Sequence, residues 1–199
     1  MTKNLSTFQR PLGERRYKKL FVISVEGSKT EPQYFAIFNQ PESIVLVKCL
    51  KRPSTKSSPI QVLKKMKSYM WKESLRKTDE AWIVVDKDTW TEDQLKELLQ
   101  WAKKNENHGF ALSNPNFEYW LLLHFEDGKG FANSQECLIR LKRHLPNYKK
   151  DIDSKKITLE LVAKAILRAK QRDTNQTDNL PKMWSTSVYK LVERILGHK

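Results

Sequence analysis

The sequence contains little cysteine and no long hydrophobic run. Its two cysteines, Cys49 and Cys137, are far apart and have neither a CxxC pattern nor a histidine at ligand spacing. They fit buried thiols in a reducing compartment better than a disulfide framework or a zinc site. No apolar stretch approaches the roughly 20 residues that a membrane-spanning helix needs, and the N-terminus lacks the apolar segment of a secretory signal. We therefore expect a soluble, cytoplasmic protein with no membrane partner.

Several motifs of catalysis and nucleotide binding are also missing. The chain has no GxxxxGK or GxGxxG motif and no Ser/His/Asp order, and its histidines lack ligand spacing. His124 follows Glu118 by six residues, about 240° around a helix, so these side chains do not share a face. We expect His124 in the core. The same is expected of three aromatic residues within apolar patterns: Trp82, Trp101 and Trp120.

Positive charge is plentiful and unevenly distributed. The formal net charge is +14, made up of +12 over residues 1–77, −7 over 78–128, +8 over 129–172 and a nearly neutral remainder. An acidic centre is therefore bracketed by two basic segments. Basic surfaces attract polyanions such as nucleic acids, whereas an acidic centre repels them unless a cation is bound there. A purely solubilising role of the charges is the alternative interpretation.

Hydrophobic patterns predict strands alternating with helices from residue 18 to residue 125. Four apolar runs, the first of them rich in Val and Ile, are typical of strands covered on both faces. They are residues 20–27, 43–50, 81–88 and 108–115. Helices are expected after them at 30–39, 59–77, 91–104 and 116–125, with Thr30 and Thr91 as N-caps. This alternation indicates an α/β fold with a mostly parallel sheet of about four strands flanked by helices.

Beyond residue 128 the pattern changes to helices, expected at about 134–144, 157–172 and 185–196. This helical extension is too small and too basic to bury much apolar surface by itself, so we expect it to pack against the α/β core. The predicted organisation has three parts: a basic N-terminal arm over 1–17, an α/β core over 18–128, and the helical extension over 129–199.

Acidic residues stand where the predicted strands end. The first strand ends at Glu26, the third at Asp86 and Asp88, and the fourth at Asn114, with Glu118 one turn into the next helix. Ligands of open parallel sheets bind beyond the carboxyl ends of the strands. In an extended segment the two aspartates also point the same way, because side chains alternate with period two. Clustered carboxylates suit a hard cation such as Mg²⁺, which would let the acidic centre meet a polyanion.

Each of these residues also has a purely structural interpretation. Glu26 can cap the following helix, and the two aspartates can cap or form the turn before the next one. For Asn114 and Glu118 we prefer the structural interpretation, a helix cap and the partner of a nearby backbone group or arginine. Gly27 can be a simple turn glycine. Glu31 fits the N-terminus of the helix, and we leave it outside the site.

Four segments carry a resemblance to a known family. A strand ending in Glu-Gly and a later one ending in Asp-x-Asp resemble the Toprim domain of topoisomerases, primases and overcoming-lysogenization-defect nucleases. In order and spacing, the chain from about residue 18 to 196 more closely resembles the RloB-like family of bacterial defence proteins. The segments that carry this resemblance are VEGSKTEPQYF, VVDKD, SNPNFEYWLLLHF and STSVYKLVERIL.

The resemblance implies a Toprim-like fold and a Toprim-type nuclease, encoded beside an ATPase and associated with abortive infection. It implies that Glu26 is a metal ligand or general acid/base, that Asp86 and Asp88 hold Mg²⁺ or Mn²⁺, and that Glu118 is an additional acidic ligand. After Asp88 the chain departs from the usual Toprim pattern, because Trp90 and no glycine follows.

Two hypotheses follow from the sequence. The first is a Mg²⁺-dependent nuclease acting on DNA or RNA in anti-phage defence, with an ATPase partner. The second is a non-catalytic nucleic-acid-binding or sensing subunit of an ATPase complex, in which the acids are structural. Self-association is open under both hypotheses. The side chains predicted to bind nucleic acid are Lys29, Lys48, Lys51, Arg52, Lys87, Arg140, Lys142, Arg143, Arg168 and Arg172.

Overall fold

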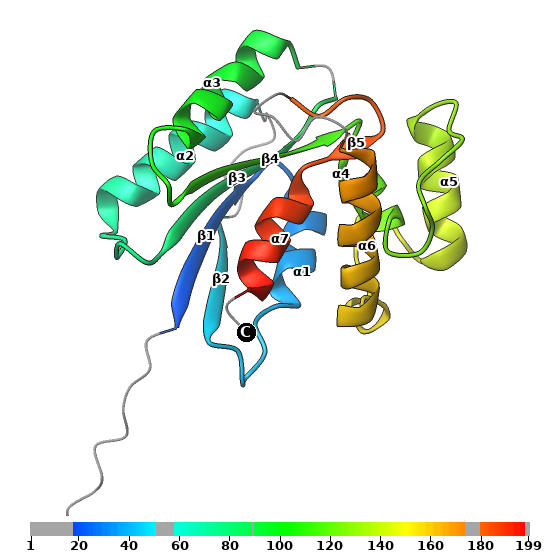
Figure 1. The fold of residues 1–199 in the computed structure, drawn as a ribbon, viewed down its shortest axis with the longest axis horizontal. Coiled ribbons are helices and arrows are strands. Elements are labelled where there is room, and N and C mark those ends of the chain that lie inside the picture. Colours follow the sequence, from blue (N-terminus) through cyan, green and yellow to red (C-terminus); the bar gives the residue numbers. More distant parts are fainter. Residues whose placement is uncertain (1–17, 51–57, 89, 174–179, 198–199) are drawn as a thin grey trace, which may run out of the picture.

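A five-stranded sheet forms the centre of the molecule. The computed structural model describes residues 18–50, 58–88, 90–173 and 180–197. The strands lie in the order β2-β1-β3-β4-β5, and β2, β1, β3 and β4 are parallel (Figure 1). This arrangement confirms the predicted α/β fold. The strands are β1 (Lys19–Val25), β2 (Val45–Leu50), β3 (Glu80–Asp86), β4 (His108–Asn114) and β5 (Ser185–Thr186).

The fifth strand corrects the prediction that only helices follow residue 128. β5 pairs antiparallel with β4, where Ser113 is opposite Thr186, and the two hydroxyl groups lie 3.0 Å apart. The predicted helix over 185–196 therefore begins only at Val188. A strand of two residues is too short to leave a periodic pattern in the sequence, so hydrophobic periodicity could not reveal it.

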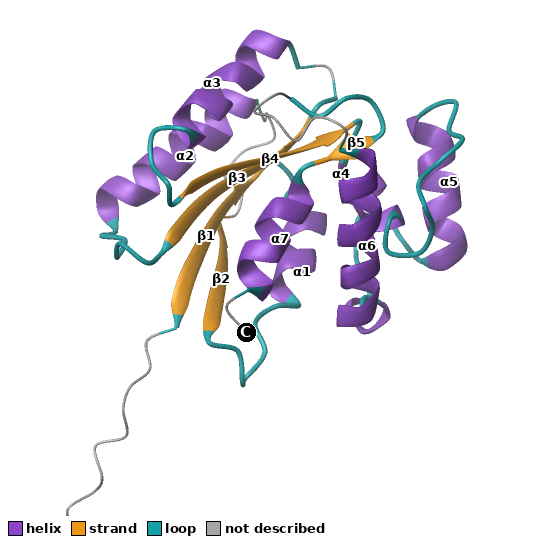
Figure 2. Ribbon diagram, viewed as in Figure 1, coloured by secondary structure: helices purple, strands orange, loops and turns teal. Residues whose placement is uncertain are grey.

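Helices cover both faces of the sheet (Figure 2). Helices α2 and α3 lie on one face, and α1, α6 and α7 lie on the other. Helix α4 lies between the edge of the sheet and α5. The helices are α1 (Thr30–Ala36), α2 (Pro59–Lys72), α3 (Glu92–Ala102), α4 (Phe117–Leu122), α5 (Ser134–His144), α6 (Leu159–Arg172) and α7 (Val188–Leu196), with a 3-10 turn at Ser154–Lys156. Within the described parts of the chain, no helix combines the length and apolar character needed to cross a bilayer.

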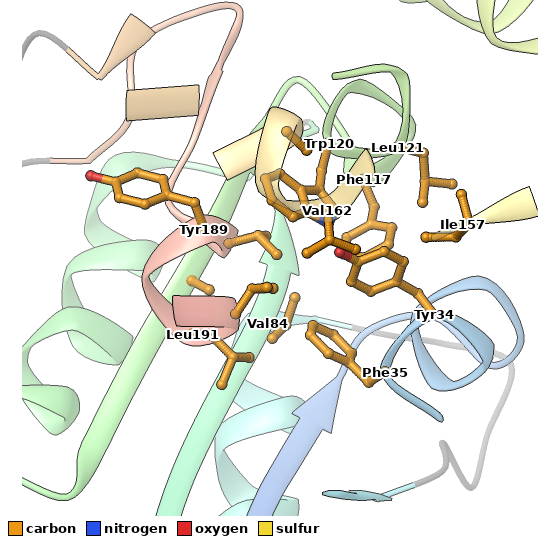
Figure 3. Packing of buried hydrophobic residues seen from close by; sticks show 14 of the residues in the cluster. Tyr34, Phe35, Val84, Phe117, Trp120, Leu121, Ile157, Val162, Tyr189 and Leu191 are labelled. Atoms are coloured by element: carbon orange, nitrogen blue, oxygen red, sulfur yellow. The ribbon is translucent and has the colours of Figure 1, made fainter. Parts of the chain in front are cut away.

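The hydrophobic core has two parts, one on each face of the sheet. Because strand side chains alternate between faces, Val22 faces the smaller part with Leu63 and Leu95 of α2 and α3. Phe21 and Ile23 face the larger part. Figure 3 shows this larger part, where side chains of α1, α4, α6 and α7 pack together over β3. The C-terminal helices thus share a core with the sheet.

Aromatic residues predicted to be internal do lie in the hydrophobic core, on one face of the sheet or the other. His124 is fully buried, and its Nε2 atom lies 3.1 Å from the hydroxyl oxygen of Tyr34. Burial lowers the pKa of His124 to about 4. The three tryptophans assigned to the core from the sequence are also buried: Trp82, Trp101 and Trp120.

Several predicted helix boundaries differ from the structure: the helices expected over 30–39 and 116–125 end at Ala36 and Leu122, and the one expected from residue 157 begins at Leu159. Two further differences have a clear cause in local contacts. Thr91 caps α3 as expected, in a capping box with Gln94. Thr30, however, is the first residue of α1 and not its cap, because its hydroxyl group donates to the carbonyl of Lys150 instead. The helix expected over 59–77 ends at Lys72, since the chain turns before β3, where Asp79 accepts a hydrogen bond from the Arg76 N–H.

Candidate functional site

The predicted acidic residues come together at the carboxyl edge of the sheet. β1 and β3 are neighbours, so Glu26 and Asp86, at their ends, lie side by side. The Asp86 N–H is 3.4 Å from a carboxylate oxygen of Glu26. Both residues, with Asp88 and Glu118, line a cavity of about 450 Å³. The cavity is also lined by Gly27, Ser28, Lys29, Thr30, Glu31, Phe117, Lys149 and Lys150.

Glu26 is held by two donors from the β3 side. Its Oε2 atom faces the Asp86 N–H, and its Oε1 atom accepts a hydrogen bond of 3.3 Å from the Trp90 indole. Trp90 follows the two aspartates in the sequence, and its indole ring orients the Glu26 carboxylate. The residue in the N-cap position of α1 is Lys29 and not Glu26.

Asp86 is the residue most affected by the acidic surroundings. No described residue donates a hydrogen bond to its carboxylate. Burial raises the pKa of Asp86, and the negative charges of Glu31, Glu118 and Glu26 raise it further, to well above its usual range. Lys150 opposes this shift only in part. A carboxyl group with a strongly raised pKa among other acids is typical of a functional site.

Asp88 reaches the same cavity by a different route from the one expected. β3 ends at Asp86, and the backbone of Asp88 turns away with a φ of 35°. Its N–H donates to the carbonyl of Pro115 at 3.1 Å. The assumption of an extended Asp-x-Asp segment is therefore wrong, although Asp88 still lines the cavity and its side chain is exposed.

Glu118 points into the site from the first turn of α4. It is buried, with an exposed fraction of 4%. Tyr148 donates its hydroxyl hydrogen to Glu118 Oε1 at 2.8 Å, and the Lys150 ammonium group forms an ion pair with the same oxygen. The expected partner of Glu118 was a backbone group or an arginine. The actual partners are a tyrosine and a lysine from the segment after α5.

Asn114 and Gly27, the two supporting residues named from the sequence, have different structural roles. Asn114 lies at the end of β4 and donates its side-chain amide to the carbonyl of Pro181 at 3.0 Å, so it does not cap α4. Gly27 donates its N–H to Glu31 at 2.9 Å. A Cβ atom at position 27 would lie 2.1 Å from a Glu31 oxygen. A side chain at position 27 would therefore displace the Glu31 carboxylate from its place beside the turn.

Three charged residues of the cavity were not assigned to the site from the sequence: Glu31, Lys149 and Lys150. Glu31 is buried, and this burial raises its pKa above the usual range, with a contribution from Glu118. Its position in a helix N-terminus gave a sufficient local explanation, which hid its role in the cavity. The two lysines belong to a segment more than 30 residues after Glu118 and carried no local signal beyond their charge.

The oxygen donors at this edge fit a hard divalent cation in chemical type. Among the residues that the structure describes, however, no three His, Cys, Asp or Glu side chains are already arranged around a common metal position. The reason lies in their partners. Glu26 faces the Asp86 N–H and Trp90, Glu31 faces Gly27, and Glu118 is engaged by its tyrosine and lysine. A metal ion coordinated by these carboxylates would require them to rotate away from these partners.

The basic side chains predicted to bind nucleic acid fall into two groups. Lys29 lines the cavity and is exposed, with Asp151 3.6 Å away. Lys48 lies on the edge strand β2 over the ring of Tyr69, and Lys87 donates to the carbonyl of Trp90. Exposed positions on α5 are occupied by Lys142 and Arg143. The remaining pair, Lys51 and Arg52, lies outside the described residues.

The second group consists of three arginines that bond to α4 or to the segment that follows it. Arg140 forms an ion pair of 2.7 Å with Glu126. Arg168 donates to the carbonyl of Leu123 at 2.7 Å, and Arg172 donates to the Tyr119 hydroxyl at 2.9 Å. These contacts favour a scaffold role for the three arginines. Arg140 ties the connection between α4 and α5 to α5, and Arg168 and Arg172 tie it to α6.

Fold and site together define a class of protein: a mostly parallel α/β protein with acidic residues gathered beyond the carboxyl ends of its strands, an arrangement consistent with a Toprim-like fold. A family model described as RloB-like protein matches residues 21–195. The chain therefore belongs to the RloB-like protein family. Searches of curated proteins and of solved structures found no match.

Proposed function

We propose that this protein is a divalent-metal-dependent nuclease that hydrolyses phosphodiesters of DNA or RNA. The observation that carries the proposal is the group of carboxylates from β1, β3 and α4 around one cavity, in which Asp86 has neighbouring acids and no hydrogen-bond donor among the described residues. Carboxylates buried close to one another lower the stability of a folded protein unless a positive charge neutralises them. A fold that retains such a cluster at a sheet edge is suited to binding a cation.

Asp86 and Glu26 would hold the metal, with Asp88 and Glu118 within the same cavity. Mg²⁺ or Mn²⁺, when bound, supplies an electrophile that polarises a phosphodiester and makes water a better nucleophile. Trp90 keeps Glu26 directed toward β3. Lys29 and Lys149 line the same cavity with exposed side chains, where they can attract the phosphate backbone.

The role in anti-phage defence and the ATPase partner are part of the proposal, and they are supported by the resemblance to RloB-like defence proteins. The chain has no nucleotide-binding motif of its own, so the ATPase would be a separate chain. Co-purification of this protein with the product of an adjacent ATPase gene tests that part, independently of the chemistry.

The substitution Asp86→Asn tests the nuclease proposal. It keeps the shape of the side chain and removes the charge that would hold the metal. We expect cleavage of plasmid, single-stranded DNA and tRNA in Mg²⁺ or Mn²⁺ to fall by about 10²-fold or more, and metal binding measured by calorimetry to be lost. Asp93→Asn is the matched control, because the Asp93 side chain is 91% exposed on α3. Equal metal binding and cleavage in both variants would refute the proposal.

A second candidate function is favoured by the partners of Glu118. Tyr148 and Lys150 satisfy this carboxylate within the protein, as expected if the acids are structural and the chain only binds nucleic acid. Under this alternative, Asp86→Asn leaves nucleic-acid binding intact, and binding falls steeply with salt. Binding without metal-dependent cleavage in the wild type would favour this candidate.

A further inference from the structure

The Lys150 ammonium group lies among the carboxylates of the cavity. It forms an ion pair with Glu118, and its charge acts on Asp86 and Glu31, whose negative charges in turn act on Lys150. The structure therefore contains a cation at the acidic cluster, supplied by the protein itself. This lysine comes from the segment between α5 and the 3-10 turn, 32 residues after Glu118.

The main chain around Lys150 is fixed to α1. The Lys150 carbonyl accepts a hydrogen bond of 2.9 Å from Thr30. The side-chain amide of Gln33 donates to Asp151 at 3.0 Å and accepts from the Ile152 N–H at 2.7 Å. Lys150 itself has a φ of 69°, in the left-handed region that a lysine seldom adopts. The backbone thus holds this side chain at the cavity at some conformational cost.

The two side chains of the ion pair between Lys150 and Glu118 differ in their exposure to solvent. The Lys150 side chain is 67% exposed, whereas that of Glu118 is 5% exposed. The ammonium group can therefore swing into solvent while the backbone keeps its hydrogen bonds. Glu118 stays behind as a buried charge, which is unfavourable unless another cation replaces the lysine.

We propose that the Lys150 ammonium group and a divalent metal ion are alternative occupants of this carboxylate cluster. This inference rests on the proposed metal-dependent function and adds to it a resident cation that the metal must displace. Both cations compete for Glu118 and for the field of Asp86, and at such short range they repel each other strongly. Once displaced, the Lys150 ammonium group joins Lys29 and Lys149 at the mouth of the cavity, where phosphate would bind.

Binding of Mn²⁺ to the full-length protein tests the exchange. Lys150→Met keeps the aliphatic part of the side chain and the backbone contact with Thr30, and it removes the competing charge. We expect this variant to bind Mn²⁺ at least about tenfold more tightly than the wild type in calorimetry at low ionic strength. Lys150→Arg, which keeps the charge, should retain weak binding. Lys155→Met is the control, because Lys155 is exposed and does not line the cavity. Unchanged or weaker binding by Lys150→Met would overturn the inference.

A second measurement needs no variant and so does not depend on how Lys150→Met folds. Acylation of lysines in the wild type, followed by mass spectrometry, reports the accessibility of each ammonium group. Mn²⁺ should increase the labelling of Lys150 several-fold and leave that of Lys155 unchanged. Labelling of Lys150 that does not respond to saturating Mn²⁺ would contradict the exchange.

The outcomes separate this inference from the proposed function. If neither the wild type nor Lys150→Met binds Mn²⁺, the metal site itself is wrong, and the inference fails with it. If the wild type binds Mn²⁺, Asp86→Asn does not, and Lys150→Met binds as the wild type does, the metal site stands and only the exchange is refuted.

Discussion

Strand β3 carries a carboxylate at each end, and the two have opposite surroundings. Glu80, at the start of the strand, is 1% exposed. It receives hydrogen bonds or ion pairs from Lys19 at 2.6 Å, from the Trp82 indole at 2.9 Å and from Arg194 at 2.9 Å. Burial acts to raise the pKa of Glu80, but the bonds from these three donors outweigh it and hold the pKa below its usual value.

Asp86, at the other end, meets mainly other acids. Its pKa is raised by burial and by the charges of Glu31, Glu118 and Glu26. The same strand thus carries Glu80, whose charge stabilises the fold, and Asp86, whose charge is repelled by its neighbours. Burial of an acid therefore says little about its role. The sign of the charges around it separates a structural acid from one suited to binding a ligand.

The largest expected difference between the two ends concerns stability. Glu80→Ala leaves Lys19 and Arg194 without their shared partner and the Trp82 N–H without an acceptor, so the free energy of unfolding should fall by about 3 kcal/mol. Asp86→Asn, measured without metal, should leave this free energy unchanged or raise it, because it removes a repelling charge. Urea unfolding at pH 7 followed by circular dichroism measures both values.

For metal-dependent cleavage, we expect the substitution of Asp86 to have the larger effect and that of Glu80 the smaller one. Glu80→Gln keeps most of the local shape and lies at the far end of the strand, so it should change cleavage by less than about threefold where Asp86→Asn abolishes it. A loss of stability in Asp86→Asn as large as that in Glu80→Ala would show that both carboxylates are structural, and the distinction between the two strand ends would fail.

The comparison also shows which parts of the structure the sequence could predict. Strands β1 to β4 are continuous apolar runs, and Glu26 and Asp86 directly follow or end two of them, so local patterns sufficed for these elements and for the meeting of their acids. The turn at Asp88 was not predictable, because it depends on the Asp88 N–H bonding to the carbonyl of Pro115, which directly follows the neighbouring strand β4.

Contacts between distant segments account for the remaining differences. Lys150 and Tyr148 approach Glu118 from 30 or more residues away, and no periodic pattern encodes that approach. Strand β5 forms because Ser185 and Thr186 pair with the edge of β4, which is also a contact between segments far apart in the sequence. Local sequence determined the elements here, and long-range pairing determined which partners the acids received.

The stability that Glu80 contributes should depend on pH. A carboxyl group whose pKa is lowered by folding contributes stability above its unfolded pKa, about 4.3 for Glu, and loses it as the pH falls through the lowered value. The wild type should therefore exceed Glu80→Gln in unfolding free energy by a constant amount above about pH 5. This excess should shrink below pH 4. Denaturant titrations of both proteins at several pH values measure it, and an excess that grows toward low pH would contradict the role given to Glu80.

The smallest expected effect concerns Glu31, which lies at the acidic end but has a bond of its own. Its Oε1 atom accepts the Gly27 N–H at 2.9 Å, and the carbonyl oxygen of a glutamine can accept the same bond. Glu31→Gln should therefore preserve the turn and remove only a buried charge that repels Asp86, so the unfolding free energy without metal should rise by less than about 1 kcal/mol. Mn²⁺ affinity should fall only a few-fold, through the weaker field of the cavity. A loss as complete as that in Asp86→Asn would instead make Glu31 a direct ligand, and the acidic end of β3 would then depend on α1 as much as on the strand itself.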